Sequence, residues 1–198
     1  MRGGRRGERA DATRALLLDA GRELFAERGY AAVGTEEVVR RAGVTRGALY
    51  HHFRDKRDLF RAVYEQVEER LIASIAAEME QAAPGDPWEL FMAGVRSFLD
   101  QCDDPAVMRI SLRDAPEVLG REEWRAIGER YALGMVTAAL RGAVEAGVMR
   151  GVDVDTLAQL LLSAFSEAAL LIATAEDPAS ARPRVEQTLM TMLDGLRA

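Results

Sequence analysis

The side chains in this sequence best suited to chemistry lie close together, in the stretch TRGALYHHFRDK at residues 45–56. Most of them donate hydrogen bonds: hydroxyl, guanidinium, phenol and imidazole groups, and the only lysine of the chain. The guanidinium of Arg46 can donate two parallel hydrogen bonds to the O6 and N7 atoms of guanine. Phenol, imidazole and ammonium groups suit phosphate oxygens. This stretch therefore favours nucleic-acid recognition.

Two short helices joined by a glycine turn are predicted to position these groups. The first begins at Thr35, whose hydroxyl can accept a free amide at a helix start. It ends at Gly43, because glycine adopts a left-handed conformation at little cost. Thr45 is expected to cap the second helix. Three apolar residues of the second helix fall at offsets that point inward: Ala48, Leu49 and Phe53.

The opposite face of the second helix is polar, and a helix of this width fits the major groove of DNA. Arg46 lies in the first turn, where a recognition helix meets base edges, and Gly47 lets the backbone approach a phosphate or a thymine methyl. Lys56, at the start of the next helix, is expected to contact a phosphate oxygen. The residues predicted to contact DNA are Thr35, Thr45, Arg46, Gly47, Tyr50, His51, His52 and Lys56.

These residues carry a resemblance. The stretch TRGALYHHFRDKRDLF resembles the recognition-helix signature of the TetR family of bacterial transcriptional regulators, and the preceding GRELFAERGYAAVGTEEVVRRAGV is similar to that family's first two helices. The similarity is specific over residues 11–64, and the remainder matches only in length and helical texture. The resemblance implies a DNA-binding domain, a second domain that varies with its ligand, and a homodimer formed by the last two helices.

The distribution of charge agrees with a DNA-reading amino-terminal third. The net charge of −6 at first counts against a nucleic-acid partner. Residues 1–57 carry +5, however, and the rest of the chain carries −11. A basic segment joined to an acidic remainder is expected of a DNA reader fused to a domain that does not bind DNA. The 48% hydrophobic content is ample for a core, and the dominance of Ala and Leu favours packed helices.

The sequence contains no pattern of catalytic or metal-binding residues. His51 and His52 are adjacent, so they cannot form a metal pair at i and i+4 on a helix. Cys102 is the only cysteine, which excludes an internal disulfide, and no histidine lies near it in sequence. No apolar run approaches ~18 residues, and no apolar segment follows the basic residues 1–10 to form a signal peptide. We therefore expect no enzyme, no cofactor, no metal, no membrane span and a cytoplasmic protein.

Helical spacing predicts an all-α fold: an amino-terminal three-helix bundle that contains the helix-turn-helix, followed by a six-helix domain. We expect a disordered basic arm at 1–10, the DNA-binding domain at 11–57 and the effector-binding and dimerisation domain at 58–198. Outside the helix-turn-helix, the helices are expected at 12–28, 55–81, 88–101, 122–146, 155–175 and 183–196, with a short helical segment at 106–112 and a loop at 115–120.

Two sets of residues in the second domain are assigned roles. The last two helices are rich in Ala and Leu and are predicted to form a four-helix bundle with a second copy. The residues expected at that contact are Ser163, Ala164, Glu167, Ala168, Leu171, Leu189, Met192 and Leu193.

Bulky and soft side chains on the surrounding helices are predicted to line an effector pocket: Phe91, Met92, Val95, Phe98, Met108, Leu112, Trp124, Tyr131, Met135 and Phe165. Candidate polar anchors are Arg113, Asp114 and Glu167.

The sequence as a whole predicts a homodimeric repressor. Its two recognition helices would enter successive major grooves of a palindromic operator, roughly 34 Å apart. A small hydrophobic effector would bind the second domain and release the DNA. Two alternatives stay open: a constitutive DNA-binding protein without an effector, and a helical enzyme or scaffold. Activation in place of repression is also compatible with the sequence.

Overall fold

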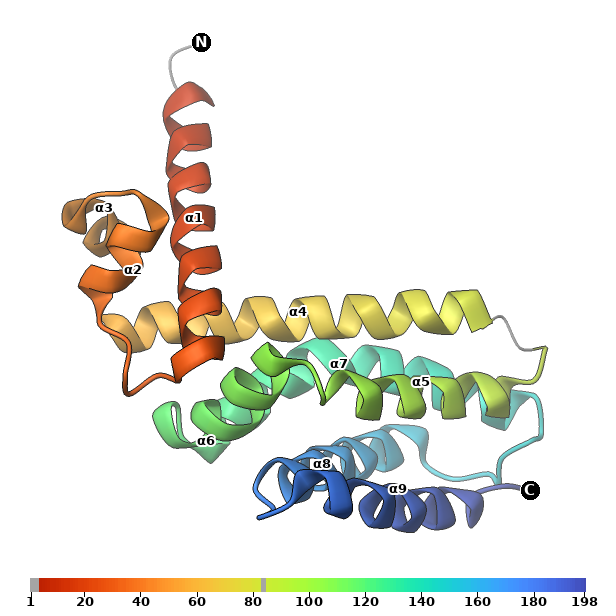
Figure 1. Cartoon of the computed structure of the whole chain (residues 1–198). Coiled ribbons are helices and arrows are strands. Elements are labelled where there is room, and N and C mark those ends of the chain that lie inside the picture. The colour runs from red at the N-terminus through yellow and green to blue at the C-terminus, as the bar shows by residue number, and fades with distance from the viewer. Residues whose placement is uncertain (1–3, 83–84) are drawn as a thin grey trace. The chain divides into compact units, whose positions relative to one another are not determined.

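The structure, a computed structural model, describes residues 4–82 and 85–198. Within these ranges the chain is helical, with no strand apart from an isolated bridge between Met149 and Arg197. In chain order (Figure 1) the helices are α1 (Gly4–Arg28), α2 (Thr35–Ala42), α3 (Arg46–His52), α4 (Lys56–Ala82), α5 (Pro87–Gln101), η1 (Val107–Asp114), α6 (Ala115–Val118), α7 (Arg121–Glu145), α8 (Val154–Ala173) and α9 (Pro178–Asp194). The predicted all-α class is confirmed.

The helices form two compact units. The first comprises the chain up to Glu68 together with Pro105–Glu122, and the second comprises Glu69–Asp104 and Glu123–Ala198. The first unit is therefore discontinuous in sequence. Besides the predicted DNA-binding segment 11–57, it includes the first turns of α4 and all of η1 and α6.

The core of the first unit is built from α1, α3 and the start of α4. Leu17 and Phe25 of α1, Leu49 of α3, and Leu59 and Phe60 of α4 are all fully buried. The rings of Phe25 and Phe60 meet edge-on with centroids 5.2 Å apart. Burying each such side chain is worth about 1.5–3 kcal/mol, so this core fixes α3 against α1. It also explains why the unit extends past residue 57, since α4 supplies two of these side chains.

Two helix starts differ from the prediction. The arm at residues 1–10 was expected to be disordered, but α1 begins at Gly4, so residues 4–10 are helical and residues 1–3 lie outside the described ranges. The last helix begins at Pro178 rather than at residue 183. Asp177 caps it and Pro178 occupies its first turn, where a missing N–H has no consequence, so Pro183 lies inside the helix.

The segment between α5 and α7 also differs from the prediction. Residues 107–114 are π-helical, and the predicted loop at 115–120 is instead the short helix α6, which follows η1 directly. Pro116 is compatible with that helix because it lies in the first turn. Gly120, with φ of +84°, lies after this helix and before α7. Short π-helical segments occur often at functional sites, and the contacts of η1 are described below.

The second unit has its own hydrophobic core, to which α5, α7, α8 and α9 contribute. Trp88, Leu99, Leu140 and Leu193 are among its most deeply buried members. The start of α8 was expected to be capped by Asp153 or Asp155, and it is the carboxylate of Asp153 that accepts a hydrogen bond of 2.7 Å from the N–H of Thr156. The stretch PGDP at 84–87 was expected to end the preceding helix; Pro84 lies outside the described residues, and α5 starts at Pro87 with Asp86 as its cap.

Candidate nucleic-acid interface

The turn between α2 and α3 has the geometry that its residue types favour. Gly43 has φ of +66°, and its N–H donates to the carbonyl of Arg40 at 3.2 Å, so the predicted glycine helix end is confirmed. The hydroxyl of Thr45 accepts from the N–H of Ala48 at 3.2 Å, which confirms the predicted cap of α3. The predicted capping by Thr35 is wrong: Gly34 occupies that position, without a side-chain bond, and Thr35 is the first helical residue.

The predicted polar face of α3 lies on the surface. Leu49 and Phe53 are buried, as their spacing indicated. The side chains of the other face are exposed or half-buried: Arg46, Gly47, Tyr50 and His51 are exposed, and His52 is half-buried. Burial lowers the pKa of His52, with further lowering by His51 and Arg14. The structure thus brings these residues together on one helix, while their contact with DNA stays a prediction.

The guanidinium of Arg46 has two neighbouring side chains within the helix-turn-helix. Its Nη1 atom lies 2.9 Å from Oε1 of Glu36 on α2. Its Cζ atom lies 5.6 Å from the centre of the Tyr50 ring. The ion pair between Glu36 and Arg46 therefore joins α2 to α3. This pair was not predicted from the sequence, because it depends on how the two helices are oriented.

The side chain of Lys56 is half-buried and has a neighbour within the protein. Its Nζ atom lies 4.0 Å from the centre of the Tyr30 ring, within range of a cation–π interaction. Burial lowers the pKa of Lys56, and the nearby carboxylate of Asp114 opposes that effect. Lys56 therefore has an intramolecular partner in addition to its predicted role at a phosphate.

Residues of η1 contact the end of α1 and the turn that follows it. The Oδ2 atom of Asp114 accepts a hydrogen bond of 2.6 Å from the N–H of Tyr30. The Nη2 atom of Arg109 lies 3.3 Å from the carbonyl oxygen of Arg28. Gly29 makes room for Arg109, because a Cβ there would lie 2.4 Å from the guanidinium. Asp114, which the sequence suggested as a polar anchor for an effector, thus accepts a backbone hydrogen bond within the first unit. No local sequence pattern predicted this contact.

The start of α4 and the end of α6 are also joined. The guanidinium of Arg57 donates through Nε to the carbonyl of Val118 at 3.1 Å and through Nη2 to that of Leu119 at 3.0 Å. Two carbonyls at the carboxyl end of a short helix are thereby satisfied. Together with Asp114 and Arg109, this contact fastens η1 and α6 to both the first and the fourth helix.

A carboxylate is buried within the first unit. Glu68 of α4 is 8% exposed, and Ser111 of η1, which lies near its carboxylate, is 2% exposed. Burial raises the pKa of Glu68 to about 7, and the Ser111 hydroxyl acts in the opposite direction. The charge of Glu68 also raises the pKa of the buried Tyr64 phenol, an effect that adds to the larger one of desolvation. No pattern in the sequence distinguishes Glu68, because charged residues are common on long helices.

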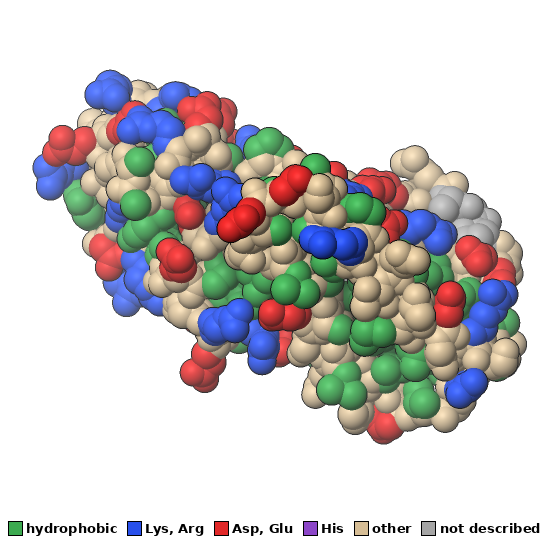
Figure 2. Space-filling view, turned by 60° about the horizontal axis from the view of Figure 1, so that its bottom comes forward, with side chains coloured by type: hydrophobic (Ala, Val, Ile, Leu, Met, Phe, Trp, Pro, Cys, Tyr) green, Lys and Arg blue, Asp and Glu red, His purple; other side chains and the backbone are tan. Residues whose placement is uncertain are grey.

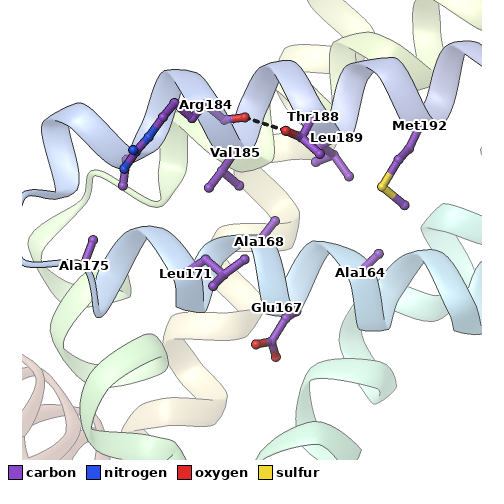
Figure 3. A pocket seen from close by; sticks show the side chains of 11 residues that line it. Ala164, Glu167, Ala168, Leu171, Ala175, Arg184, Val185, Thr188, Leu189 and Met192 are labelled. Carbon is purple, nitrogen blue, oxygen red and sulfur yellow. Dashed lines mark hydrogen bonds between the residues drawn. The ribbon is translucent and has the colours of Figure 1, made fainter.

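The outer face of α8 and α9 contains an apolar groove of about 510 Å³. Figure 2 looks onto the side that bears these helices and shows apolar side chains with few charges among them. Figure 3 shows the groove running between the two helices, with Leu171 and Met192 among its lining side chains. Leu171 is 54% exposed and Met192 58% exposed, which is unusual for large apolar residues. Six of the predicted dimer residues line the groove: Ala164, Glu167, Ala168, Leu171, Leu189 and Met192.

The other two predicted dimer residues lie elsewhere. Leu193 has no exposed surface and belongs to the core of its own unit, and Ser163 is half-buried outside the groove lining.

The helix α8 has the length and hydropathy of a membrane span over Val154–Ala173, but half of that window is buried. A core helix of a soluble protein has the same properties, so α8 is weak evidence for a membrane span.

The predicted effector residues are divided between the two units. Phe91, Met92, Val95 and Phe165 belong to the core of the second unit, and Phe98 packs against it. Trp124, Tyr131 and Met135 lie on α7 of the same unit, whereas Met108 and Leu112 lie on η1 in the first unit. Their role in binding an effector stays a prediction. Among the described residues, no three His, Cys, Asp or Glu side chains gather as a metal site would require.

A capped recognition helix behind a glycine turn, combined with a second helical unit, defines a helix-turn-helix DNA-binding protein. Residues 17–63 match the family described as bacterial regulatory proteins, tetR family, and residues 88–196 match the tetracyclin repressor-like C-terminal domain. The chain is 29% identical over 154 residues to the transposon Tn10 TetC protein of Escherichia coli, covering 78% of this chain and 77% of that protein.

Solved structures agree with these matches. A TetR-family transcriptional regulator from Pectobacterium atrosepticum superposes with a TM-score of 0.85 at 33% identity, covering 96% of this chain and 97% of that one. RolR in complex with resorcinol superposes with a TM-score of 0.74 at 21% identity, covering 96% and 90%. The chain therefore belongs to the TetR family of bacterial transcriptional regulators. Its matches are DNA-binding regulators and not enzymes.

Proposed function

We propose that this protein is a homodimeric repressor that occupies a palindromic operator and is released by a small hydrophobic effector. The observation that carries the proposal is the exposed polar face of α3, with Arg46 in its first turn. A regulator of this kind acts on chromosomal or plasmid DNA, so we assign it to the cytoplasm.

Recognition of the operator is assigned to α2 and α3. We assign Arg46 to the reading of guanine. The residues that we assign to positioning contacts with the sugar–phosphate backbone are Thr35, Thr45, Gly47, Tyr50, His51, His52 and Lys56. Of these, Thr45 also caps α3 and Lys56 also contacts Tyr30, so both couple a local structural role to the proposed contact.

Dimerisation is assigned to the groove between α8 and α9. Leu171 and Met192, which line this groove, are each more than half exposed, and monomeric proteins rarely leave contiguous apolar surface of this kind uncovered. A second copy is the occupant we propose, because one patch that is apolar along its length can meet itself across a two-fold axis. Such a dimer would present two copies of α3 to a palindromic site.

The effector is assigned to the second unit. Its core is rich in aromatic and soft side chains, including Phe91, Met92 and Phe165, which suit an apolar ligand. The structure of RolR holds resorcinol, so the shared fold can accommodate a small aromatic molecule in that protein. Release requires that the effector prefer the form that does not bind DNA.

Selection of DNA by the purified full-length protein tests the proposal. We expect a random-sequence duplex pool to yield an inverted repeat with half-site centres about one helical turn apart. A reporter with that repeat inside its promoter should fall in expression when the protein is present. Recovery of no preferred sequence would overturn the assignment of the reader. Enrichment of single half-sites would overturn the dimer, and increased reporter expression would overturn repression.

A screen for stabilising ligands tests the effector. Small aromatic and aliphatic compounds should include some that raise the melting temperature and weaken binding to the selected repeat. Stabilisation without loss of DNA affinity would contradict release by the effector. If no apolar compound of a broad panel had either effect, the constitutive alternative would replace the proposal.

A further inference from the structure

The ion pair between Glu36 and Arg46 joins the second residue of α2 to the first residue of α3. Their side chains meet at 2.9 Å across ten positions of sequence. Tyr50, one turn further along α3, lies beneath the guanidinium at 5.6 Å. The guanidinium thus contacts a carboxylate through Nη1 and lies over an aromatic ring.

This pair contributes little to folding. The side chain of Arg46 is 66% exposed and that of Glu36 is 77% exposed. Ion pairs between exposed side chains stabilise a fold only slightly, because water screens the charges and both side chains lose conformational freedom. The main effect of the ion pair is therefore on the orientation of the Arg46 guanidinium. A guanidinium is a planar fork, so fixing one edge directs the remaining N–H groups.

We propose that Glu36 is a positioning residue for base recognition, holding the free edge of Arg46 toward the O6 and N7 atoms of a guanine. The inference rests on the proposed DNA-reading function of α3. Arg46 has five N–H donors, so the bond to Glu36 leaves enough for a bidentate contact with the base. An arginine already oriented in the free protein loses less conformational freedom on binding.

The carboxylate of Glu36 has a second effect, which acts on binding to every duplex. A negative charge at the reading surface repels the phosphates of every duplex, whatever the sequence. Glu36 therefore weakens non-specific binding while it favours binding to the correct base. Both effects raise the ratio of specific to non-specific affinity. Removal of Glu36 should shift the two affinities in opposite directions, and a purely structural role would not do this.

The test uses the duplex that the wild-type protein selects, alongside a scrambled duplex of equal length. Glu36→Ala should weaken binding to the selected duplex by about tenfold, within the range of one bidentate base contact, and should strengthen binding to the scrambled one. Glu36→Gln keeps an amide oxygen that can accept from Arg46, so it should restore much of the specific affinity. It should still show the stronger scrambled binding, because the charge is lost in both variants.

Glu23→Ala is the matched control. Glu23 forms an exposed ion pair with Arg41 at 3.0 Å in the same unit, with exposures of 48% and 44%. The control removes the same charge and the same kind of contact but leaves Arg46 oriented. It should change both affinities in the same direction. The midpoint of urea denaturation should be unchanged in both alanine variants, as expected of exposed positions.

A double-mutant cycle with Arg46→Ala decides whether Glu36 acts through Arg46. If it does, Glu36→Ala should have no further effect on base preference once Arg46 is absent. Additive effects would show that Glu36 contacts a base directly, which overturns the positioning role. An unchanged base preference in Glu36→Ala would also overturn it, while the selected duplex would still support the proposed function. If the wild-type protein selected no sequence, the proposed function itself would fail.

Discussion

The carboxylate of Asp114 accepts a hydrogen bond of 2.6 Å from the backbone N–H of Tyr30, joining positions 84 residues apart. Tyr30 lies in the turn that leads from α1 to α2, so η1 holds the entrance to the helix-turn-helix. Arg109 supports the same turn through the carbonyl of Arg28. The orientation of α2 and α3 against α1 thus depends on a segment far from them in sequence.

Replacement of Asp114 tests this contact. Asp114→Ala should lower the free energy of unfolding by about 1.5–3 kcal/mol, the range for a hydrogen bond to a charged group. Urea denaturation monitored by circular dichroism measures it. Glu117→Ala, three residues further on and exposed, is the control and should change stability by less than about 0.5 kcal/mol. Equal effects of the two substitutions would contradict the role of Asp114.

The buried carboxylate of Glu68 predicts a pH dependence of stability. Its pKa is about 7 in the folded protein and 4.5 when it is unperturbed, so folding favours the neutral acid. Stability from this group is complete below pH 4.5 and is lost as pH rises through 7, because the unfolded chain ionises first. The total loss is about 3 kcal/mol at 1.36 kcal/mol per pKa unit.

Glu68→Gln removes this titration. The variant should gain stability relative to wild type as pH rises from 5 to 8, by up to about 3 kcal/mol, in urea titrations at each pH. Glu69→Gln removes the same charge from an exposed neighbour and should show a difference from wild type that does not vary with pH. A pH-independent difference for Glu68→Gln as well would show that the carboxylate is not desolvated.

Lys56→Ala separates the two roles of this side chain. A phosphate contact predicts weaker binding to all duplexes alike and a salt slope lower by about 1 for each half-site. The contact with Tyr30 at 4.0 Å predicts a loss of stability of about 0.5–2 kcal/mol. Filter binding over a range of salt and urea denaturation measure the two effects. A stability loss with an unchanged salt slope would leave Lys56 only its structural role.

Leu171→Glu tests the proposed dimer face. A carboxylate placed in an apolar contact loses its hydration, so the dissociation constant of the dimer should rise by at least about tenfold. Sedimentation velocity at several concentrations measures it. Leu16→Glu is the matched control, since Leu16 of α1 is 51% exposed and Leu171 is 54% exposed. If both variants kept the wild-type mass distribution, the groove would not be the dimer contact.

The parts of the fold that were predictable depend on neighbours in sequence. The start of α3 followed from Thr45, because a cap acts within one turn. The exposed face of α3 followed from helical spacing. Glu36 escaped prediction because its bond to Arg46 depends on the angle between two helices. The roles of Asp114 and Glu68 escaped it too, since their partners come from distant segments.

The discontinuity of the first unit has a consequence for synthesis of the chain. The segment through Glu68 is made first, but Pro105–Glu122 completes the same unit only after 54 more residues. At a synthesis rate of about 5–20 residues per second, η1 and α6 are therefore made on the order of 3–11 s after the helix-turn-helix segment. During this interval Tyr30 lacks Asp114, and Arg57 lacks the carbonyls of Val118 and Leu119. The reader therefore emerges from the ribosome before its supports do, and reaches its final form only when most of the regulator has been translated.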